Sequence, residues 1–500
     1  MKIKTSYQYA LFGMGTLALF LFCFCRNEGV TVRQVQLLMQ CLLFGGVCLL
    51  YWVSKKRGFS YRYLVSFLIF AGFVMRVGYM LYTPAAVRSH DFGSLEKNSY
   101  GHFRYIYTIY STGRLPDTNR VQMYHPPLYY ALSAVCMRLL QLLTGVTEPE
   151  RLVEAAKLVS CAASCITLTT SKALCRELLL GDRATAVVLA LLAFLPNFYL
   201  LAGRVNNDSL VICFMGLILL QTIRWYRDCS RKNTILLALF FGFGMMTKIS
   251  CAVLAFFTGA VMLAALWRDA KLGSVRNWLK QILLFGCIAI PFGMWYPIRN
   301  LLRFQQSLYY VPTPADVNSR LYVGNVSLWD RFFLIPLRNL FSPLYNSPWE
   351  DWNVELYLWK GSLFGEFSFS IISWIPKLLL LLRGVLLLLS LVALAVCAFR
   401  SLFEVIKRTD KDRARQAFFR LGLVLVWGLT ICSYLAFNLK LPFGCTMDYR
   451  YIVMAAIVEA VLLGDSLEQT WKGQRIWTAA VILATVAFSV VSVVMFTKIG

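Results

Sequence analysis

Three histidines and an aspartate are the residues of this chain best suited to chemistry. The 500 residues include only three histidines, His90, His102 and His125, and all lie in one hydrophilic stretch between two apolar runs. Asp91 and Arg104 lie in the same stretch. A carboxylate beside imidazoles can take the proton of a hydroxyl group while cations hold a phosphate. The alternative is an ordinary solvated loop whose charges meet lipid headgroups.

The histidines do not form a compact metal-binding pattern. Their separations of 12 and 23 residues match no ligand spacing of a compact site. We therefore expect no metal and no other cofactor. A divalent metal held by the three histidines and Asp91 is the less favoured alternative.

The elements that must position these residues are membrane helices. Hydrophobic residues make up 58% of the chain and charged residues 15%, against roughly 25% charged residues in soluble domains. Apolar runs of about 20 residues cross a bilayer as helices, because every backbone polar group must be satisfied internally. The sequence therefore predicts an all-α polytopic membrane protein with roughly 12–14 crossings. The candidate runs are 8–25, 35–53, 63–82, 126–143, 153–175, 184–202, 208–226, 233–247, 249–267, 277–298, 373–398, 417–437, 449–464 and 476–497.

The positive charge of the chain marks one side of the membrane. The chain has 50 Lys and Arg against 25 acidic residues, a formal charge of +25. Most of the excess lies in short basic clusters between apolar runs, which are typical of cytoplasmic loops. The two longest polar stretches, 83–125 and 299–372, are then expected outside. Nucleic acid is not expected as a partner, because no soluble domain carries a basic face. The clusters fall within 55–62, 224–232, 268–280 and 400–415.

The predicted topology contains one conflict. Between the outer stretch 83–125 and the basic cluster 224–232 an odd number of crossings is required, yet four apolar runs lie there. One of the four must be re-entrant, broken or merged with a neighbour. Pro196 makes the run 184–202 the first suspect, since proline interrupts a helix.

The first outer stretch carries a short helix of its own. Between Gly101 and Gly113, the side chains of Phe103, Ile106 and Tyr110 recur at helical spacing. An aromatic amphipathic helix of this kind lies flat in the membrane interface.

Further charged residues lie at predicted helix ends. Lys248 interrupts an apolar region and is either functional or a snorkelling residue between two helices. Arg299 and Arg450 lie where helices meet the outer surface, as phosphate ligands or as rim arginines. Asp208 opens an apolar helix, where helix capping is the alternative to a role in a site.

Several of these motifs together resemble a known family. The segment 60–460 resembles the GT-C fold membrane glycosyltransferases of the bacterial family 39 type, which are related to protein O-mannosyltransferases and lipid A aminoarabinose transferases. The residues that carry the resemblance are His90-Asp91, Gly101-His102-Phe103-Arg104-Tyr105-Ile106, Gly113-Arg114-Leu115-Pro116-Asp117, Tyr124-His125-Pro126-Pro127-Leu128-Tyr129-Tyr130, Arg204-Val205-Asn206-Asn207-Asp208, Thr247-Lys248, Pro297-Ile298-Arg299-Asn300 and Asp448-Tyr449-Arg450-Tyr451.

The resemblance implies a GT-C fold and an extracytoplasmic transfer of a sugar. The donor would be a polyprenyl-phosphate-linked sugar, and the acceptor a cell-surface glycan, lipid or protein. Asp91 would be the general base, and one candidate base without a covalent nucleophile favours inversion. The residues implied for the donor phosphate are Arg88, Arg104, His125, Lys248, Arg299 and Arg450. Those implied for binding or orienting the acceptor are His90, His102, Tyr105, Asn207, Asp208 and Tyr449.

The same resemblance suggests a division of the chain. Residues 1–55 add two helices, 56–298 form the GT-C module with the catalytic stretch 83–125, 299–372 form an outer lid, and 373–500 supply the last helices. The competing hypothesis is a transporter or flippase of lipid-linked sugars. Transporters show repeated halves with broken helices, and we detect no such repeat.

Overall fold

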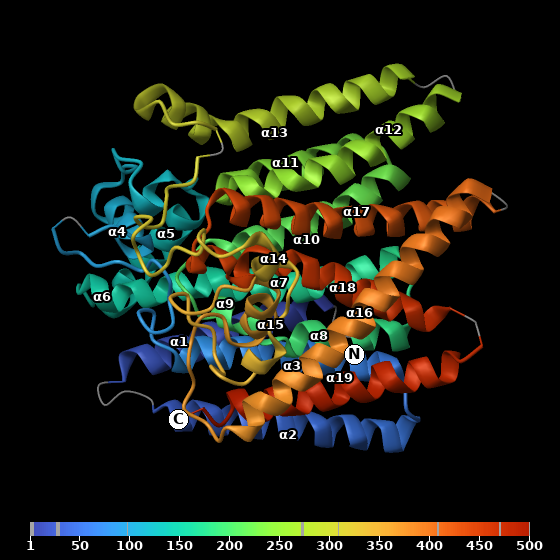
Figure 1. Cartoon of the computed structure of the whole chain (residues 1–500), viewed down its shortest axis with the longest axis horizontal. Helices are drawn as coiled ribbons and strands as arrows, with labels where there is room; N and C mark the ends of the chain where they lie inside the picture. Colours follow the sequence, from blue (N-terminus) through green and yellow to red (C-terminus); the bar gives the residue numbers. More distant parts are fainter. Residues whose placement is uncertain are drawn as a thin grey trace.

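The fold is a bundle of roughly parallel and antiparallel helices (Figure 1). The computed structural model describes residues 5–26, 31–97, 99–271, 275–308, 310–407, 410–469 and 472–499. Within these ranges there is no strand, only the isolated bridge between Tyr322 and Phe443. The predicted all-α class is therefore confirmed. The α-helices are α1 Thr5–Cys25, α2 Val32–Arg57, α3 Tyr61–Tyr82, α4 His102–Thr112, α5 Leu128–Thr144, α6 Pro149–Leu152, α7 Ala156–Glu177, α8 Asp182–Phe194, α9 Pro196–Ala202, α10 Asp208–Arg227, α11 Arg231–Thr247, α12 Ala255–Lys271, α13 Val275–Phe304, α14 Leu328–Phe332, α15 Val354–Phe364, α16 Trp374–Lys407, α17 Lys411–Lys440, α18 Val453–Asp465 and α19 Gln474–Phe496.

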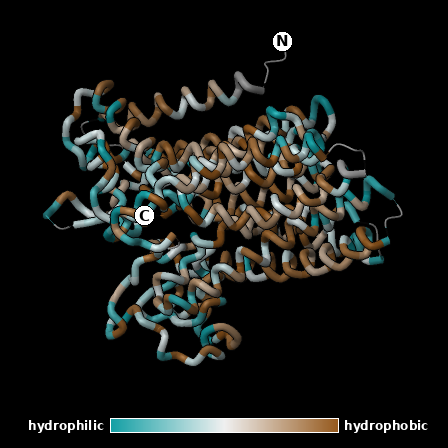
Figure 2. The backbone as a smooth tube through the Cα atoms, turned by 90° about the horizontal axis from the view of Figure 1, so that it is seen from above, coloured by the Kyte–Doolittle hydropathy of each residue, from teal (hydrophilic) through white to brown (hydrophobic). Residues whose placement is uncertain are grey.

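The helices have the composition of membrane spans. Nine of the described helices are long and apolar enough to cross a bilayer, or ten if α8 and α9, which meet at an angle of 52°, form one bent span. The predicted 12–14 crossings exceed this number, because several of the predicted apolar runs, such as those of α11 and α18, form helices shorter than 18 residues. Figure 2 shows apolar residues along the middle of the bundle and hydrophilic residues at its two ends.

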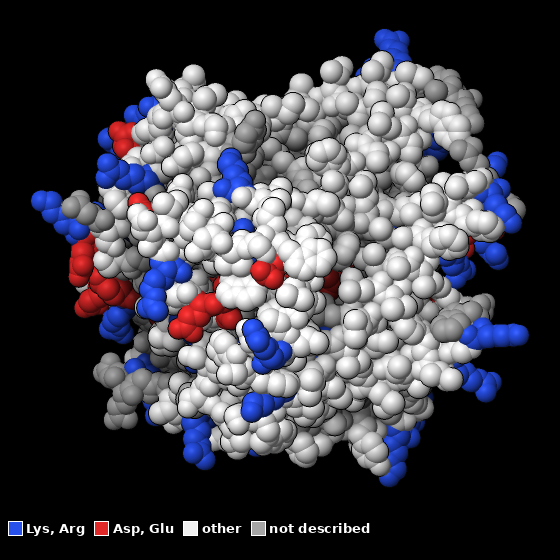
Figure 3. Space-filling view, in the orientation of Figure 1, with Lys and Arg blue, Asp and Glu red and all other residues white. Residues whose placement is uncertain are grey.

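One end of the bundle, here named the basic end, holds the four predicted basic clusters. Residues 272–274 and 408–409 of these clusters lie outside the described residues. In Figure 3, Lys and Arg predominate at this end, on the right, whereas many acidic residues lie toward the other end. Arg62 contacts Asp182 at 3.0 Å, and Arg224 contacts Glu177 at 2.9 Å. These pairs place the end of α7 and the start of α8 at the basic end.

The helix that does not cross the bundle, and so resolves the conflict in the number of crossings, is α5 and not the run 184–202. The run 184–202 is broken, as suspected, since α8 and α9 meet at 52° before Pro196, but it still extends from the basic end to the opposite end of the bundle. Both ends of α5 lie at the end opposite the basic one. The segment after α5 returns to the end of α3, since Lys157 Nζ donates to the carbonyl of Thr83 (2.6 Å) and the amide of Ala85 donates to Glu154 (2.8 Å). The run 126–143 therefore enters and leaves by the same face.

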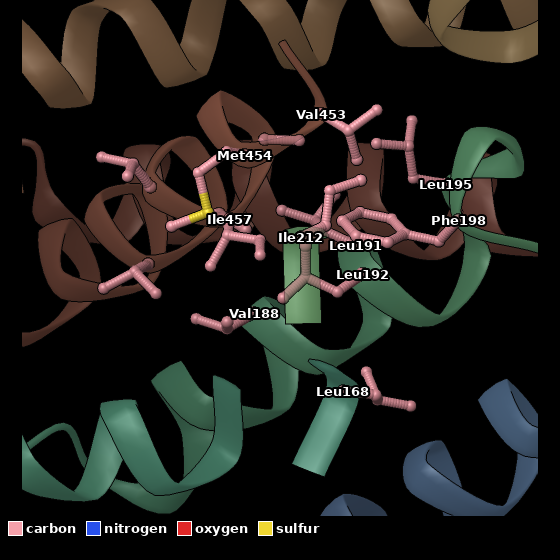
Figure 4. Packing of buried hydrophobic residues seen from close by; sticks show 14 of the residues in the cluster. Leu168, Val188, Leu191, Leu192, Leu195, Phe198, Ile212, Val453, Met454 and Ile457 are labelled. Carbon is pink, nitrogen blue, oxygen red and sulfur yellow. The ribbon is translucent and has the colours of Figure 1, made fainter. Parts of the chain in front are cut away.

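The core between α3, α7, α8, α10 and α18 is apolar and closely packed (Figure 4). One charge is enclosed near it: Arg76, on α3, is fully buried. Its guanidinium donates to Ser164 Oγ (2.9 Å) and to the carbonyls of Leu192 (2.9 Å) and Gly72 (3.0 Å). Because the bonds to Ser164 and Leu192 reach neighbouring helices, Arg76 fastens α3 to α7 and α8.

Candidate functional site

A cavity of about 310 Å³ opens at the end of the bundle opposite the basic end, here named the cavity end. Its lining combines charged and polar side chains with apolar ones, as a site for an amphipathic ligand requires. The polar residues include Asp91, His102, Tyr124, His125, Asn207, Asp208, Lys248 and Arg450, and the apolar ones Val211, Ile212, Met215, Ile249, Val253, Phe437, Val453 and Met454. Seven of these eight polar residues are among the candidates from the sequence, and Tyr124 is not.

A tight backbone loop presents Asp91 to the cavity. Asp91 has φ 54°, in the left-handed region that a residue other than glycine adopts at a cost. The amide of His102 donates to the Asp91 carbonyl (2.8 Å), which ties the loop to the first turn of α4. At Gly101 an added Cβ would lie 2.6 Å from that carbonyl oxygen, so only glycine permits this close approach.

The Asp91 carboxylate is held in its ionised form by its neighbours. Arg450 Nη2 lies 3.5 Å from Asp91 Oδ2, and the aspartate side chain is 43% exposed. Burial would raise the pKa of Asp91, but the positive charge of Arg450, aided by His102 and His90, outweighs it and lowers that pKa below its ordinary value. Asp91 is therefore a carboxylate at neutral pH, able to accept a proton.

Two cations flank one tyrosine ring at the polar end of the cavity. Lys248 Nζ lies 5.2 Å from the centroid of the Tyr451 ring, and the Arg450 guanidinium carbon lies 5.0 Å from it. Lys248 follows the last residue of α11 and pairs with Asp208 Oδ1 at 2.6 Å. Both cations also line the cavity, so both are available to an anionic group bound there.

The two histidines of the cavity are neutral. His102 Nδ1 lies 2.9 Å from the hydroxyl of Tyr130, and the two imidazole rings stack with their centroids 6.3 Å apart. Burial lowers the pKa of His102 to about 4, and it also lowers the pKa of His125 well below its ordinary value. Neither ring carries a charge at neutral pH, so their polar contacts are hydrogen bonds.

A second charged group lies behind the cavity, buried in protein. His90 Nε2 lies 3.2 Å from Glu366 Oε2 and 3.4 Å from Asp448 Oδ2. The hydroxyl of Tyr357 donates to Glu366 Oε1 at 2.6 Å. Arg450 Nε lies 3.4 Å from Asp448 Oδ2, so Arg450 contacts an acid of each group. We name His90, Glu366, Asp448 and the nearby Arg204 the buried group.

The two acids of the buried group have opposite pKa shifts. Burial and then the negative charge of Asp448 raise the pKa of Glu366 to about 8. Burial acts in the same direction on Asp448, but the contacts with His90 and Arg450 outweigh it and hold the pKa of Asp448 well below its ordinary value. At neutral pH the group therefore contains one carboxylate and one protonated carboxyl.

The buried group was also tested as a metal site. The nitrogen of His90 and oxygens of Glu366 and Asp448 lie within 4.8 Å of one another, and these are suitable zinc ligands. However, Arg450 contacts the same Asp448 oxygen, and Arg204 is fully buried above the Phe367 ring, 4.4 Å from its centroid. Arg450 and Arg204 thus place positive charge beside the acids that a metal ion would have to share.

Five of the predicted site residues do not line the cavity in the described part of the chain. Their side chains are engaged elsewhere, so we do not carry forward the roles expected of them. The Arg88 guanidinium lies over the Phe369 ring (4.8 Å), Arg104 donates to the carbonyl of Leu95 (2.9 Å), Arg299 donates to the carbonyl of Pro116 (2.9 Å), the Tyr105 hydroxyl donates to the Tyr296 hydroxyl (2.9 Å), and the Tyr449 hydroxyl accepts from Arg383 (3.3 Å).

Two further predicted residues are His90, which lies outside the cavity, and Asn207, which lines it. His90 belongs to the buried group, one residue from Asp91. Asn207 lines the cavity, and its amide donates to the carbonyl of Thr247 (3.1 Å), which fixes the residue before Lys248. Glu366 was not among the residues predicted from the sequence. Its only distinguishing feature there is that it is the single acidic residue between 356 and 373.

The chain was then compared with known proteins. Residues 124–295 match the family model described as dolichyl-phosphate-mannose-protein mannosyltransferase. No curated protein matches the chain.

Solved structures of low identity also match. The apo oligosaccharyltransferase of Archaeoglobus fulgidus is 11% identical with a TM-score of 0.47, and the match covers 89% of this chain and 57% of that one. ArnT from Cupriavidus metallidurans bound to undecaprenyl phosphate is 15% identical with a TM-score of 0.34, and the match covers 81% of this chain and 76% of that one. The chain thus spans little more than half the length of the oligosaccharyltransferase. The family match confirms the resemblance predicted from the motifs: over residues 124–295, the chain is similar to membrane glycosyltransferases of the mannosyltransferase type.

Proposed function

We propose that the protein transfers a sugar from a polyprenyl-phosphate carrier to a hydroxyl-bearing acceptor. The observation that carries this proposal is the lining of the cavity, which combines a carboxylate and two cations with apolar side chains from α10, α17 and α18. A polyprenyl phosphate has the same division, with an anionic head at the membrane interface and an apolar chain. Such complementarity is what a lipid-phosphate site requires.

In this proposal Lys248 and Arg450 bind the donor phosphate. The phosphate gains negative charge as the bond to the anomeric carbon breaks, and cations fixed in advance stabilise that charge. Both side chains are paired with acids, Lys248 with Asp208 and Arg450 with Asp91 and Asp448, so their positions are set before the donor arrives. The neutral imidazole of His125 supplies a hydrogen bond at the same end of the cavity.

Asp91 acts as the general base. Its carboxylate takes the proton of the acceptor hydroxyl, whose oxygen forms the new bond to the anomeric carbon as the bond to the phosphate oxygen breaks. His102 lies beside it and can orient the acceptor by a hydrogen bond. A single base without a covalent intermediate gives inversion at the anomeric carbon.

The reaction is placed on the extracytoplasmic side of a cell membrane. The basic end of the bundle is assigned to the cytoplasm because Lys and Arg concentrate in cytoplasmic loops, and the cavity lies at the other end. The acceptor is then a glycan, lipid or protein of the cell surface.

The test is a transfer assay in membranes with a labelled polyprenyl-phosphate sugar. Asp91→Asn is expected to lower the transfer rate by about 10²- to 10⁴-fold, the usual contribution of a general base. The matched control is Asp117→Asn, which changes a 73% exposed acid of the same outer stretch and should leave the rate unchanged. Equal rates for wild type and Asp91→Asn would overturn the assignment of the base. No transfer by the wild type from any polyprenyl-phosphate donor would overturn the function.

The transporter hypothesis gains no support from the buried charges. Arg76 is hydrogen-bonded to its own helix and to α7 and α8, and Glu459 pairs with Arg383 at 3.5 Å and accepts from the Trp427 indole (3.1 Å). These charges join neighbouring helices and line no path between the two ends of the bundle.

A further inference from the structure

The outer stretch between α13 and α16 contains a segment with an unusual surface. In residues 328–341, here named the apolar segment, seven large apolar side chains are between 39% and 68% exposed. A contiguous exposed apolar surface is rare where water covers a protein and marks a site of interaction. These side chains are Leu328, Trp329, Phe333, Leu334, Ile335, Leu337 and Phe341.

The backbone of the apolar segment finds its hydrogen bonds inside the protein. Asn353, at the start of α15, donates from Nδ2 to the carbonyls of Asp330 (2.9 Å) and Leu334 (3.0 Å). Lys360 Nζ, on the same helix, donates to the carbonyls of Asn339 (2.8 Å) and Pro343 (2.6 Å). Both Asn353 and Lys360 are buried. Loop carbonyls need internal partners of this kind where water is scarce, as it is in a membrane.

The position of the apolar segment relates it to the membrane spans. Arg331 Nη2 donates to the carbonyl of Asn438 (3.1 Å), in the last turn of α17, a candidate span. The following residue, Leu439, is 52% exposed. Trp374, the first residue of the span α16, is 58% exposed. The exposed apolar side chains therefore continue the apolar surface of α16 and α17 at the cavity end.

We propose that the apolar segment inserts into the lipid leaflet at the cavity end of the bundle. Its partner is the interface of a phospholipid bilayer, where apolar side chains reach about 5–10 Å below the headgroups. Trp329 is of the residue type favoured at this depth, and the exposed Arg338 is a cation that suits headgroup phosphates. The insertion fixes the depth of α15, which carries the Tyr357 hydroxyl bound to Glu366.

Depth-dependent quenching tests the proposal. The full chain carries a coumarin amino acid at Phe333, or at the exposed Asn318 as the matched control, and is placed as single copies in phospholipid nanodiscs. With acyl-chain-brominated phospholipid, quenching at position 333 is expected to be at least about threefold stronger than at 318, because only the former lies within reach of the acyl chains. Aqueous iodide should show the reverse order.

Two outcomes would overturn the proposal. Equal quenching by iodide at both positions, without quenching by brominated lipid, would show that the segment lies in water. Protection of position 333 from iodide only in discs that hold two copies would assign the surface to contact between copies. Phe333 is 68% exposed and, in the described part of the chain, its ring stacks only on the exposed Trp329 ring, so the label disturbs little packing, and an unchanged gel-filtration profile verifies the fold.

Discussion

Two charged groups meet at the turn that contains Asp448 and Arg450, and they differ in how far their side chains are exposed. In the cavity, Asp91 is 43% exposed and Lys248 16% exposed. In the buried group, the Glu366 side chain is 4% exposed and that of Asp448 0%. The first group is open to a ligand that supplies further negative charge. The second is enclosed by protein, and its contact with Arg450 helps to hold that side chain in place.

If the buried group is structural, removing its central charge should cost the most stability. Asp448→Asn leaves Arg204 and Arg450 without their shared counter-charge, and breaking a buried ionic group typically costs about 3–5 kcal/mol. Denaturant unfolding in a fixed detergent should show a lower free energy of unfolding. Asp412→Asn, at an 80% exposed acid, is the matched control. A free energy of unfolding equal to that of wild type would show that the charges of the buried group do not stabilise the fold.

If the cavity group is open to a ligand, changing it should affect binding instead. Lys248→Met removes one cation from the donor phosphate, and a charged hydrogen bond contributes about 1.5–3 kcal/mol. We expect the KM for the polyprenyl-phosphate donor to rise by roughly 10- to 150-fold.

A second variant separates this effect from the loss of the Lys248–Asp208 pair. Lys248→Met combined with Asp208→Asn leaves no unpaired carboxylate, and the rise in KM should persist. A donor KM restored by the second change would contradict the phosphate role of Lys248.

The pH dependence of the free energy of unfolding tests whether Glu366 is protonated in the folded protein. Its pKa is about 8 in the folded protein and near its ordinary value when unfolded. The folded state therefore binds the extra proton, and stability falls as pH rises toward 8, by about 1.4 kcal/mol per pH unit from this group. The unfolding free energy of Glu366→Gln should fall less steeply between pH 6 and 8 than that of wild type. Parallel curves would show that Glu366 is ionised in the folded protein.

The smallest expected effect tests whether the buried group holds a metal. Its two guanidinium groups supply positive charge beside its acids. Treatment with EDTA and dialysis should therefore change the transfer rate by less than about twofold and the unfolding midpoint by less than a few degrees. Loss of activity that zinc or manganese restores would contradict this charge balance.

The sequence predicted the cavity better than the buried group, for a physical reason. Asp91, Lys248 and Arg450 lie in motifs or interrupt apolar runs, so each is visible in the chain. Glu366 has no such context, and its meeting with His90 depends on tertiary packing. His90 and Asp91 are adjacent in the sequence yet belong to different groups, because the positive φ of Asp91 turns the backbone between them.

The all-α class of the fold was predicted correctly, but the run 126–143 was counted among the helices that cross the membrane. Hydropathy detects an apolar run but not the depth to which it enters the membrane. The run 126–143 has the composition of a span, yet it lies beside α4 at the cavity end. Its position is set by contacts beyond its own sequence, such as Arg138 with the carbonyl of Tyr110 (2.9 Å). Pro196, by contrast, bends a helix that still crosses.

The placement of α5 has a mechanical consequence. A helix that enters and leaves by one face can shift along its length without pulling a polar loop through hydrocarbon. The unit of α4, α5 and the segment between them carries His102 and His125, and it is held by the hydrogen bonds of Tyr296 to Tyr105 and Met123 and by the packing of α5 on α7. Such a shift would change the wall of the cavity that contains His102 and His125 without requiring the membrane spans to separate.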